Sequence, residues 1–400
     1  MFTDILYITT NGLGEPLGRS QIFSYLKKNA SEFNFHLISL EKKRFLSQES
    51  EIDLLTECSK LSISWKFGYF ISKPYFLSTL INMLRIFYFS VITLISKKDI
   101  SIIHCRSYIP AFIGLLLAKI FNKKLIFDMR GLWIEELIAS GSVKKGGILH
   151  KLLRFFERLT LKSSSHIITL TNSSKTYLVE NQKVAIDKIS VIPTCVDLDV
   201  FYPSLQHNSR NTIKFVVLGT ILSGWFKLDH LAKFIRSIDN SNTNVEFDII
   251  TTENCDQIKD ALELEGIEIS NLKLNIFSKR REELAEVLQN QDFGLMFYES
   301  KYLSEIARSP TKIGELLACG IPIIINSGIG DIDNLIQEKQ IGIKIDDLDN
   351  IEESLNQLLA LRQDNNLKQR CIQTAHEVYS VTKGSEAYSQ IYKDLNNNSL

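Results

Sequence analysis

The stretch ISIIHCRSYIPAFIGLLLAKIFNKKLIFDM, from Ile100 to Met129, has a short apolar run rich in β-branched residues at each end. These two runs predict strands, and the longer apolar segment that begins at Pro110 predicts a helix between them. Strands that are apolar throughout are buried on both faces, which is the environment of a parallel sheet covered by helices. The stretch therefore predicts a β-α-β unit of an α/β fold.

The same alternation of strands and helices occurs on both sides of this stretch and is interrupted once, at VIPTCVDLDVFYPSLQHNSRN (191–211). The sequence therefore predicts two doubly wound, Rossmann-like parallel-sheet domains, residues 1–195 and 206–381, joined by a hinge and linker. We expect a helix at about 382–400 to pack back on the first domain. The carboxyl ends of both sheets should face one cleft, where such sheets bind ligands. Further predicted strands are DILYITT, HLISL and HIITLT in the first half, and KFVVLGT, NVEFDIIT, LKLNIF, FGLMFY, IPIIIN and IGIKI in the second.

The composition is that of a soluble, core-forming protein, with 44% hydrophobic and 23% charged residues among 400. This excludes a disordered chain, a fibre and a coiled coil. Residues 1–205 contain 26 Lys and Arg against 17 Asp and Glu, whereas the remaining chain contains 20 against 29. The basic first half is expected to face an anionic partner such as a membrane surface, and we expect no nucleic-acid partner.

The six scattered cysteines form no CxxC pair, and no export signal is visible at the N-terminus, so we expect a reduced, cytoplasmic protein. The segment 75–96 is long enough to cross a bilayer, but Asn82 and Arg85 lie in its middle. We expect an ordinary core helix there. A helix lying on the membrane surface and a spanning helix remain as alternatives.

The segment from Arg308 to Pro322 carries the sharpest local signal for a ligand site. Ser309 is a good N-cap and Pro310 suits the first helical position, so free amides should lie at the positive end of the helix dipole. Arg308 and Lys312 add positive charge, and Glu315 could accept hydrogen bonds from sugar hydroxyls. A nucleotide diphosphate with a ribose fits both features. The alternative is a capped surface helix with incidental charges.

Five segments follow one another along nearly the whole chain: GLGEPLGRSQ (12–21), IIHCRS (102–107), IFDMRGLW (126–133), VIPTCVDLDVFYP (191–203) and SPTKIGELLACGIP (309–322). In these segments and their order the chain resembles glycosyltransferase family 4, whose members have the GT-B fold. The resemblance implies a retaining transferase that takes a sugar from a nucleotide diphosphate sugar bound by the C-terminal domain. The acceptor, a saccharide or a lipid-linked molecule, would be bound by the N-terminal domain.

The resemblance also implies roles for single residues. Glu315 matches the second glutamate of the E-x7-E motif, which holds the ribose hydroxyls in that family. The first glutamate would fall at Ala307, so its contact is missing here or is supplied by Glu305, Lys301 or another group. The family's usual arginine after the first strand of the second domain is replaced by Thr220. The donor-binding residues expected on these grounds are Gly219, Thr220, Lys227, Arg308, Ser309, Thr311, Lys312 and Glu315, and Trp225 is expected either to wall the cleft or to pack at a helix start.

In the first half, Gly12, Gly14 and Gly18 follow the first strand and could let the backbone approach a phosphate or sugar. Arg19 could meet an anionic acceptor or be a solvated loop residue. The loop lacks the GxGxxG spacing, and no fitting acidic residue is expected to end a second strand, so we do not predict dinucleotide binding.

Asp128 occupies the position where many members of the family carry a histidine near the reacting sugar. We expect it to orient the acceptor hydroxyl or act as a base, with Arg130 holding its charge or binding a phosphate. A structural turn contact between Asp128 and Arg130 is the alternative. His104 and Arg106 end the preceding strand on the same side, and His104 could equally be a hydrogen-bonded core residue.

No metal site and no cofactor are expected. The two DLD strings, at 197–199 and 347–349, do not lie at the cleft end of a predicted sheet. The predicted protein is thus a metal-independent, hexosyltransferase-like retaining enzyme, cytoplasmic or peripheral at the inner face of the membrane, in surface polysaccharide or glycoconjugate synthesis. A non-catalytic nucleotide-sugar-binding protein or partner subunit is the main alternative, and an epimerase or phosphorylase is a third.

Overall fold

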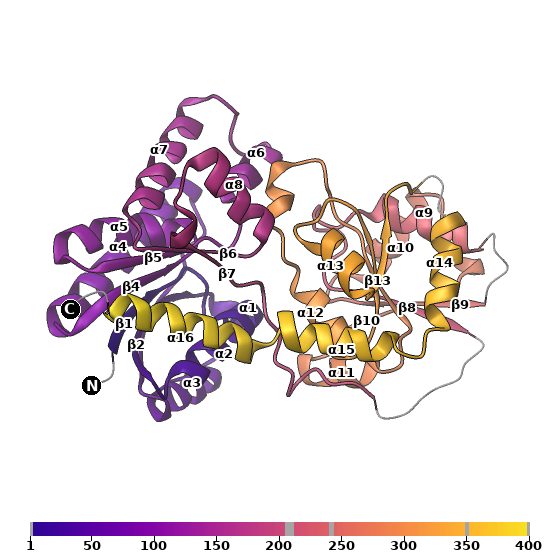
Figure 1. The fold of residues 1–400 in the computed structure, drawn as a ribbon, viewed down its shortest axis with the longest axis horizontal. Helices are drawn as coiled ribbons and strands as arrows, with labels where there is room; N and C mark the ends of the chain where they lie inside the picture. Colours follow the sequence, from indigo (N-terminus) through magenta and orange to yellow (C-terminus); the bar gives the residue numbers. More distant parts are fainter. Residues whose placement is uncertain (1–2, 205–211, 240–243, 349–351, 398–400) are drawn as a thin grey trace. The chain divides into compact units, whose positions relative to one another are not determined.

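The structure is a computed structural model that describes residues 3–204, 212–239, 244–348 and 352–397. It divides into an N-terminal unit, Met1–Pro193 with Val381–Leu400, and a C-terminal unit, Thr194–Ser380. Each unit has one parallel sheet with helices around it, so the predicted fold class of two doubly wound sheets is confirmed (Figure 1).

The N-terminal unit has a seven-stranded parallel sheet in the order β3-β2-β1-β4-β5-β6-β7. The central strand β4 is buried at all but one position, as its apolar sequence predicts, and its near neighbour β2 is buried to the same extent. The strands are β1 Thr3–Ile8, β2 Phe33–Glu41, β3 Ile63–Tyr69, β4 Ile100–Arg106, β5 Lys124–Asp128, β6 His166–Thr169 and β7 Ile189–Val191.

Successive strands are added on one side of β1 up to β3, and then on its other side from β4 to β7. This change of direction decides which face of the sheet each connecting helix covers. Right-handed crossovers from β1 to β2 and β3 place α2 and α3 on one face, and those from β3 to β4, β5 and β6 place α4, α5 and α7 on the other. On this second face, α4 packs against α5, and α5 packs against α7. The helices are α1 Pro16–Gly18, α2 Ser24–Asn29, α3 Gln48–Lys60, α4 Tyr75–Ser96, α5 Tyr108–Phe121, α6 Trp133–Ala139, α7 Ile148–Ser163, α8 Asn172–Gln182 and α16 Val381–Asn397, with short turns η1 Arg19–Phe23, η2 Lys43–Phe45 and η3 Ile186–Lys188.

The last helix, α16, belongs to the N-terminal unit although it is the end of the chain. It packs against α2 and β4, and Figure 1 shows it running past α2. Its buried face includes Tyr388 and Tyr392, which are 3% and 1% exposed. This helix therefore brings aromatic side chains from the C-terminus to the strands of the first sheet.

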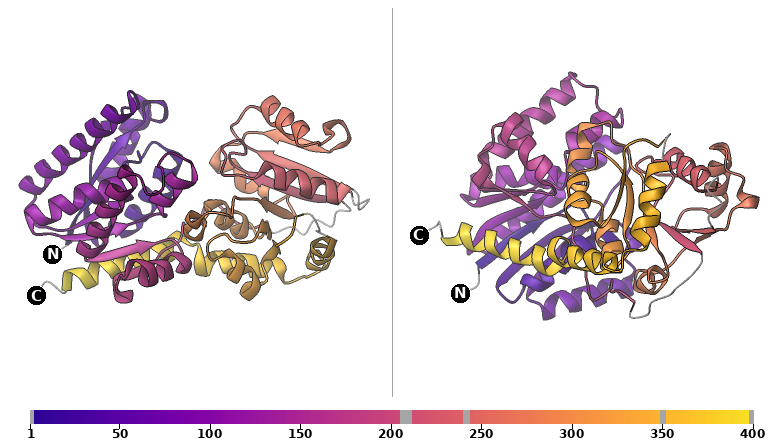
Figure 2. Two further views of the ribbon diagram at one scale, coloured as in Figure 1. Left: turned by 90° about the horizontal axis from the view of Figure 1, so that it is seen from above. Right: turned by 45° about the vertical axis from the view of Figure 1, so that its right-hand side comes forward.

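The C-terminal unit has a six-stranded parallel sheet in the order β10-β9-β8-β11-β12-β13, and all six strands fall on runs that the sequence predicts (Figure 2). The strands are β8 Ile213–Leu218, β9 Val245–Ile250, β10 Leu274–Phe277, β11 Phe293–Met296, β12 Ile323–Asn326 and β13 Gly342–Ile345. The helices are α9 Leu228–Asp239, α10 Cys255–Leu264, α11 Arg281–Leu288, α12 Thr311–Ala318, α13 Ile332–Lys339, α14 Glu352–Arg362 and α15 Leu367–Val378, with turns η4 Ile269–Asn271 and η5 Leu303–Ala307.

The structure differs from the sequence-based expectation at both edges of the first sheet and at the linker. The edge strands β3 and β7 and the helix α3 were not predicted, although ISWKFGY in β3 alternates apolar and other residues as a half-buried strand does. The expected linker is also shorter, because the C-terminal unit begins at Thr194. Val196 and Phe201 are buried in its core, and the Val196 amide donates to the Tyr379 carbonyl at 2.6 Å.

Helix α4 is the one helix in the described chain that is long and apolar enough to cross a membrane. It packs against β1, β2 and β3, so it is a helix of the α/β layer as expected. Only 33% of its Leu77–Ser96 window is buried, however, which leaves much of its apolar surface uncovered.

Candidate active site

In the C-terminal unit, Glu315 lies on the first turns of α12 and is 3% exposed. Its carboxylate accepts a hydrogen bond from Lys312 Nζ at 3.0 Å, and Arg281 Nη1 lies 3.5 Å from its other oxygen. The Glu315 side chain therefore does not project into solvent. Lys312, whose side chain is 32% exposed, is the member of the pair that reaches the surface.

Arg281 was not predicted as a site residue. It is the first residue of α11 and stacks over the ring of Phe201, with 5.1 Å between the guanidinium carbon and the ring centroid. The sequence places it 34 residues before Glu315, at the start of a helix that carries no motif. Its position at the end of β10 and before a helix was the available signal, because ligand sites of parallel sheets lie at such ends.

Gly219 directly follows β8 with φ +98°, a conformation that favours glycine. A Cβ atom built on Gly219 would lie 3.5 Å from Cε of Lys312, so the end of β8 and the lysine are close neighbours. Thr220 comes next and is exposed. The structure thus brings three of the predicted donor residues, Gly219, Lys312 and Glu315, to one end of the sheet.

Arg308 is anchored by three groups. Its guanidinium forms an ion pair with Glu305 and lies over the rings of Trp225 and Tyr298, at 4.9 and 5.4 Å from their centroids. Glu305 is 1% exposed and also accepts from Ser304 Oγ at 3.0 Å. Trp225 is 42% exposed, so it is a surface aromatic that holds Arg308 and not a core residue.

Ala307 stands where the family has its first glutamate, and Glu305 and Lys301 are the nearby polar residues that could replace that contact. Ala307 is 3% exposed and contributes no polar group, while Lys301 is exposed on the loop before η5. Of the two named candidates, Glu305 is the one beside Arg308, but its carboxylate already forms an ion pair with that arginine.

Ser309 does not cap the following helix, which corrects the prediction. The helix begins at Thr311 with Pro310 at its N-cap and no side-chain capping bond. The Ser309 hydroxyl accepts from the Thr194 amide at 3.2 Å, and the Thr194 hydroxyl donates to the Ser309 carbonyl at 2.6 Å. Ser309 therefore fixes the start of the C-terminal unit to this loop.

Lys227 lies near two acidic groups. Its Nζ is 3.3 Å from Asp229 and 3.8 Å from Glu299. Lys227 therefore faces two carboxylates, whereas Lys312 and Arg308 each pair with one, so Lys312 and Arg308 are the stronger candidates for a diphosphate.

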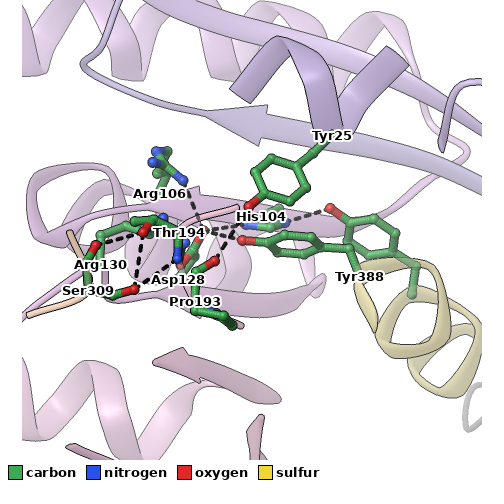
Figure 3. Close-up of polar contacts among 10 residues, drawn as sticks. Tyr25, His104, Arg106, Asp128, Arg130, Pro193, Thr194, Ser309 and Tyr388 are labelled. Carbon is green, nitrogen blue, oxygen red and sulfur yellow. Dashed lines mark hydrogen bonds and ion pairs between the residues drawn. The ribbon is translucent and has the colours of Figure 1, made fainter. Parts of the chain in front are cut away.

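In the N-terminal unit, Asp128 is the centre of a buried charged cluster at the carboxyl ends of β4 and β5 (Figure 3). Tyr388 donates to Asp128 Oδ2 at 3.0 Å, and Arg106 Nη1 and His104 Nε2 lie 3.5 and 3.6 Å from the same oxygen. Arg130 Nη1 lies 3.7 Å from Oδ1. The predicted residues of the two strand ends are thus brought together around one carboxylate.

The electrostatics of this cluster favour a permanently charged Asp128. Burial raises the pKa of Asp128, but Arg130, His104 and Arg106 outweigh it and lower the pKa to about 2. A carboxylate with so low a pKa is a weak general base at neutral pH. The low pKa argues against Asp128 as a general base. Its contacts fit a residue that holds Arg106 and Arg130 in position.

Several atoms of the cluster have unused hydrogen-bonding capacity. Within the described part of the chain, no hydrogen-bond partner is found for four buried atoms: His104 Nε2, Arg106 Nη1, Asp128 Oδ1 and Arg130 Nη1. Arg130 also has φ +58°, an uncommon conformation for a residue with a side chain. Strained backbone and unpaired buried donors are features that cluster at ligand sites.

His104 is the hydrogen-bonded core residue that the sequence analysis left as an alternative. It is fully buried, its Nδ1 lies 2.7 Å from the hydroxyl of Tyr392, and its ring lies 4.4 Å from that of Tyr7. Burial lowers its pKa, so it is neutral near pH 7. The surrounding tyrosines, Tyr7, Tyr25, Tyr388 and Tyr392, were not predicted.

The glycine-rich loop after β1 is folded on itself. Glu41, at the end of β2, is fully buried and accepts from the Leu13 and Gly14 amides at 2.8 and 3.0 Å. A Cβ on Gly18 would meet the Gly12 carbonyl oxygen at 1.8 Å. The glycines are therefore required by internal packing, and these two amides are already bonded to protein.

An acidic residue, Glu41, does end the second strand. Its carboxylate is used by the loop, and by Ser39 Oγ at 2.6 Å, so it does not face a ribose. Arg19, the other charged residue predicted near this loop, is half-exposed and forms an ion pair with Glu57 at 3.2 Å.

Comparison with known proteins follows the same division of the chain. Residues 41–200 match the family model Glycosyltransferase Family 4, and residues 238–381 match the model Glucosyltransferase 3-like, C-terminal domain. Together the two models cover about three quarters of the chain. The chain belongs to glycosyltransferase family 4. No curated protein matches it.

The fold of this family 4 glycosyltransferase is similar to several solved GT-B structures. A glycosyltransferase from Rickettsia africae is 17% identical over 99% of both chains, with a TM-score of 0.70. A sucrose-phosphate synthase from Thermosynechococcus elongatus is 12% identical over 99% of this chain and 100% of that one, with a TM-score of 0.69. The Anabaena protein HepE, in complex with UDP and glucose, is 13% identical over 97% and 99%, with a TM-score of 0.66.

Metal-ligating side chains do not gather in the described regions of the glycosyltransferase, since no group of three or more His, Cys, Asp or Glu residues could hold an ion there. Of the two DLD strings, 347–349 lies partly outside the described residues. In the other, the Asp199 amide donates to the Asp197 carboxylate at 3.1 Å, which closes a local turn.

Proposed function

We propose that this glycosyltransferase moves a hexose, with retention of configuration, from a nucleotide diphosphate sugar to a saccharide or lipid-linked acceptor without a metal ion. The observation that carries the proposal is the buried Glu315 held by Lys312 and Arg281 beside Gly219. A ribose can donate its hydroxyls to the Glu315 carboxylate, and Lys312 at the mouth of the site can bind the adjoining phosphate.

The diphosphate would be bound by protein cations. Lys312 and Arg308 lie near the start of α12, whose first amides carry no side-chain cap. When the bond between the anomeric carbon and the diphosphate oxygen breaks, negative charge develops on the leaving group. Cations and amides already in place stabilise that charge without a reorganisation step.

The N-terminal cluster would contribute to acceptor binding. Arg106 and Arg130 carry two positive charges, and Asp128, which forms ion pairs with both, balances one of them. Guanidinium nitrogens that do not face Asp128 can donate to an oxygen of an acceptor, and a phosphate or carboxylate would match the net charge best. Asp128 holds both arginines in position in this proposal.

The direct test is a binding panel of nucleoside diphosphates and their sugars, read as thermal stabilisation. UDP and UDP-glucose are the first ligands to try, because the complexes of HepE contain them. A ligand at 100 times its Kd adds about 2.7 kcal/mol to stability, enough to raise the Tm by a few degrees. If none of the panel stabilises the protein, the donor site is wrong.

A non-catalytic nucleotide-sugar-binding protein or partner subunit is the second candidate. It is favoured by Ala307 at the position of the family's first glutamate and by Glu305, which is already bonded to Arg308. Release of the nucleotide diphosphate, measured with and without a saccharide or lipid-linked acceptor, separates the two. Binding without release under any of these conditions would support the non-catalytic protein.

A further inference from the structure

Helix α4 is turned with its apolar residues outward. Exposed positions recur every three or four residues, which places them in one stripe along the helix. The exposed fractions range from 39% at Ile92 to 62% at Ile95. The stripe consists of Leu77, Leu80, Leu84, Tyr88, Ile92 and Ile95.

The polar residues of α4 face the sheet, and their bonds fix this orientation. Asn82 accepts from the Ile71 amide at 3.1 Å and donates to the Ile71 carbonyl at 2.8 Å. Lys66 Nζ lies 3.3 Å from the Thr93 hydroxyl, and Ser90 is buried. The helix therefore cannot rotate its apolar stripe inward without breaking these contacts.

The apolar surface continues onto the two neighbouring helices. Leu116 and Ile120 of α5 are 50% and 59% exposed, and α7 exposes Ile148, Leu149, Leu152, Phe155 and Phe156. Figure 1 shows α4, α5 and α7 on the same part of the N-terminal unit, and α5 contacts both other helices, so the three helices form one layer over the sheet. We call the exposed apolar residues of the three helices the α4/α5/α7 face.

The size of this face is unusual for a free surface. Isolated exposed apolar side chains are normal in proteins, but a contiguous apolar patch marks an interaction site. Almost half of the large hydrophobic residues exposed in the described chain lie on these three helices. A face of this kind is typical of a surface that binds a partner.

The charges around the face indicate which partner it is. The only acidic residue in the three helices is Glu157, which is buried and bonded to Tyr108 and Arg154. Asp99 lies in the loop after α4. The exposed basic residues on these helices and their adjoining loops are Lys73, Lys97, Lys98, Lys119, Lys144, Lys145, Lys151, Arg158 and Lys162.

We propose that the α4/α5/α7 face docks flat on a lipid bilayer that carries anionic headgroups. The apolar stripes would enter the boundary between headgroups and acyl chains, and the lysines at their edges would meet the lipid phosphates. A second copy of the chain is a poorer partner, because pairing this face with itself would bring clusters of like charge together.

Not every basic residue near the face can meet lipid: the Lys124 side chain is half-buried and donates to the Leu395 carbonyl. The apolar residues are the main contact, and Lys119, Lys151 and Lys162 add the preference for anionic lipid. Docking of this kind does not depend on which sugar is transferred.

The test is cosedimentation of the full chain with extruded vesicles of phosphatidylcholine, either alone or with one quarter phosphatidylglycerol. We expect binding to the anionic vesicles that weakens as salt rises. Leu84→Glu with Tyr88→Glu should reduce the bound fraction at least tenfold. Ile52→Glu and Leu264→Glu, at positions 64% and 89% exposed on α3 and α10, are matched controls that should bind as the parent does.

A charge variant separates the two contributions. Lys119→Gln, Lys151→Gln and Lys162→Gln together should abolish the preference for anionic vesicles. Absent binding, binding that the Glu pair leaves intact, or a solution dimer that the Glu pair dissociates would each overturn the proposal. Thermal stabilisation by UDP should be the same in the variant with Leu84→Glu and Tyr88→Glu as in the parent. A failure of the docking proposal can therefore be distinguished from a failure of the proposed donor site.

Discussion

Lys312 Nζ donates to the Glu315 carboxylate at 3.0 Å across one turn of α12, and only the lysine reaches the surface. Glu315 is therefore a fixed negative group at the floor of the site, and Lys312 is a positive group at its mouth. The hydroxyls of a ribose can donate to the Glu315 carboxylate, and the adjoining phosphates can bind the positive charge of Lys312. This pairing gives the first prediction.

Replacement of Lys312 by alanine should weaken UDP binding about tenfold or more. A hydrogen bond to a charged group contributes about 1.5–3 kcal/mol, and 1.4 kcal/mol is a factor of ten in affinity. Glu315→Gln should also weaken binding, because the neutral amide accepts less strongly from ribose hydroxyls. Isothermal titration calorimetry measures both effects.

Lys259→Ala is the matched control, because Lys259 is an exposed lysine on α10. Its affinity for UDP should equal that of the parent. If Lys312→Ala and Glu315→Gln also bind UDP like the parent, the donor site is elsewhere.

The donor half of this site is predictable where the signal is local. Lys312 and Glu315 lie within four residues of each other, and the helix period brings them to one side. Arg281 is 34 residues away in sequence, and Tyr388 is 260 residues from Asp128, so no local pattern joins these pairs. Arg281 meets Glu315 because of the strand order in the second sheet, and Tyr388 meets Asp128 because α16 packs in the N-terminal unit. Neither arrangement is visible in a local sequence pattern.

Ser309 shows how a tertiary contact overrides a local preference. A serine before Pro310 is a good N-cap by propensity, but its hydroxyl is taken by the Thr194 amide. The glycine-rich loop shows the reverse case. Gly14 and Gly18 were predicted as possible ligand-loop residues from their place after the first strand, whereas the buried Glu41 explains why the loop folds as it does.

Replacement of Asp128 by asparagine should destabilise the protein at neutral pH by about 3–5 kcal/mol. The change leaves Arg106 and Arg130 buried beside a neutral group, which is the cost of breaking a buried ion pair. Chemical denaturation at pH 7 measures the change in the free energy of unfolding. Asp53→Asn, at an exposed aspartate on α3, should change it by less than about 0.5 kcal/mol.

Asp128→Asn should also change how the free energy of unfolding depends on pH below about pH 4. The folded pKa of Asp128, about 2, lies below its ordinary value of 3.8, so its charged form is favoured by folding. Its contribution is therefore complete above about pH 4 and is lost as the pH falls through 2. The difference in stability between parent and Asp128→Asn should narrow in that window. A difference that stays constant down to pH 2 would contradict the lowered pKa.

Replacement of Glu41 by glutamine should lower the Tm while leaving UDP affinity unchanged. A glutamine can accept with only one oxygen, so at least one of the Leu13, Gly14 and Ser39 donors loses its partner. An unsatisfied buried donor costs about 1–3 kcal/mol. Glu49→Gln, at an exposed position on α3, should have the Tm of the parent. A large loss of UDP affinity in Glu41→Gln would contradict this and would indicate that the glycine-rich loop takes part in donor binding.

Activity should survive EDTA. The charges assigned to the diphosphate come from Lys312 and Arg308, with Arg281 completing the positive shell around Glu315, so the leaving group needs no divalent ion in this arrangement. Direct chromatographic detection of the released nucleotide diphosphate is the appropriate measurement, because a coupling enzyme could itself need magnesium. The EDTA reaction should also remain more sensitive to Arg308→Ala than to Lys259→Ala, since the protein cations carry the charge. Loss of activity on chelation, restored by magnesium or manganese, would show that an ion shares the diphosphate and that the metal-independent mechanism is wrong.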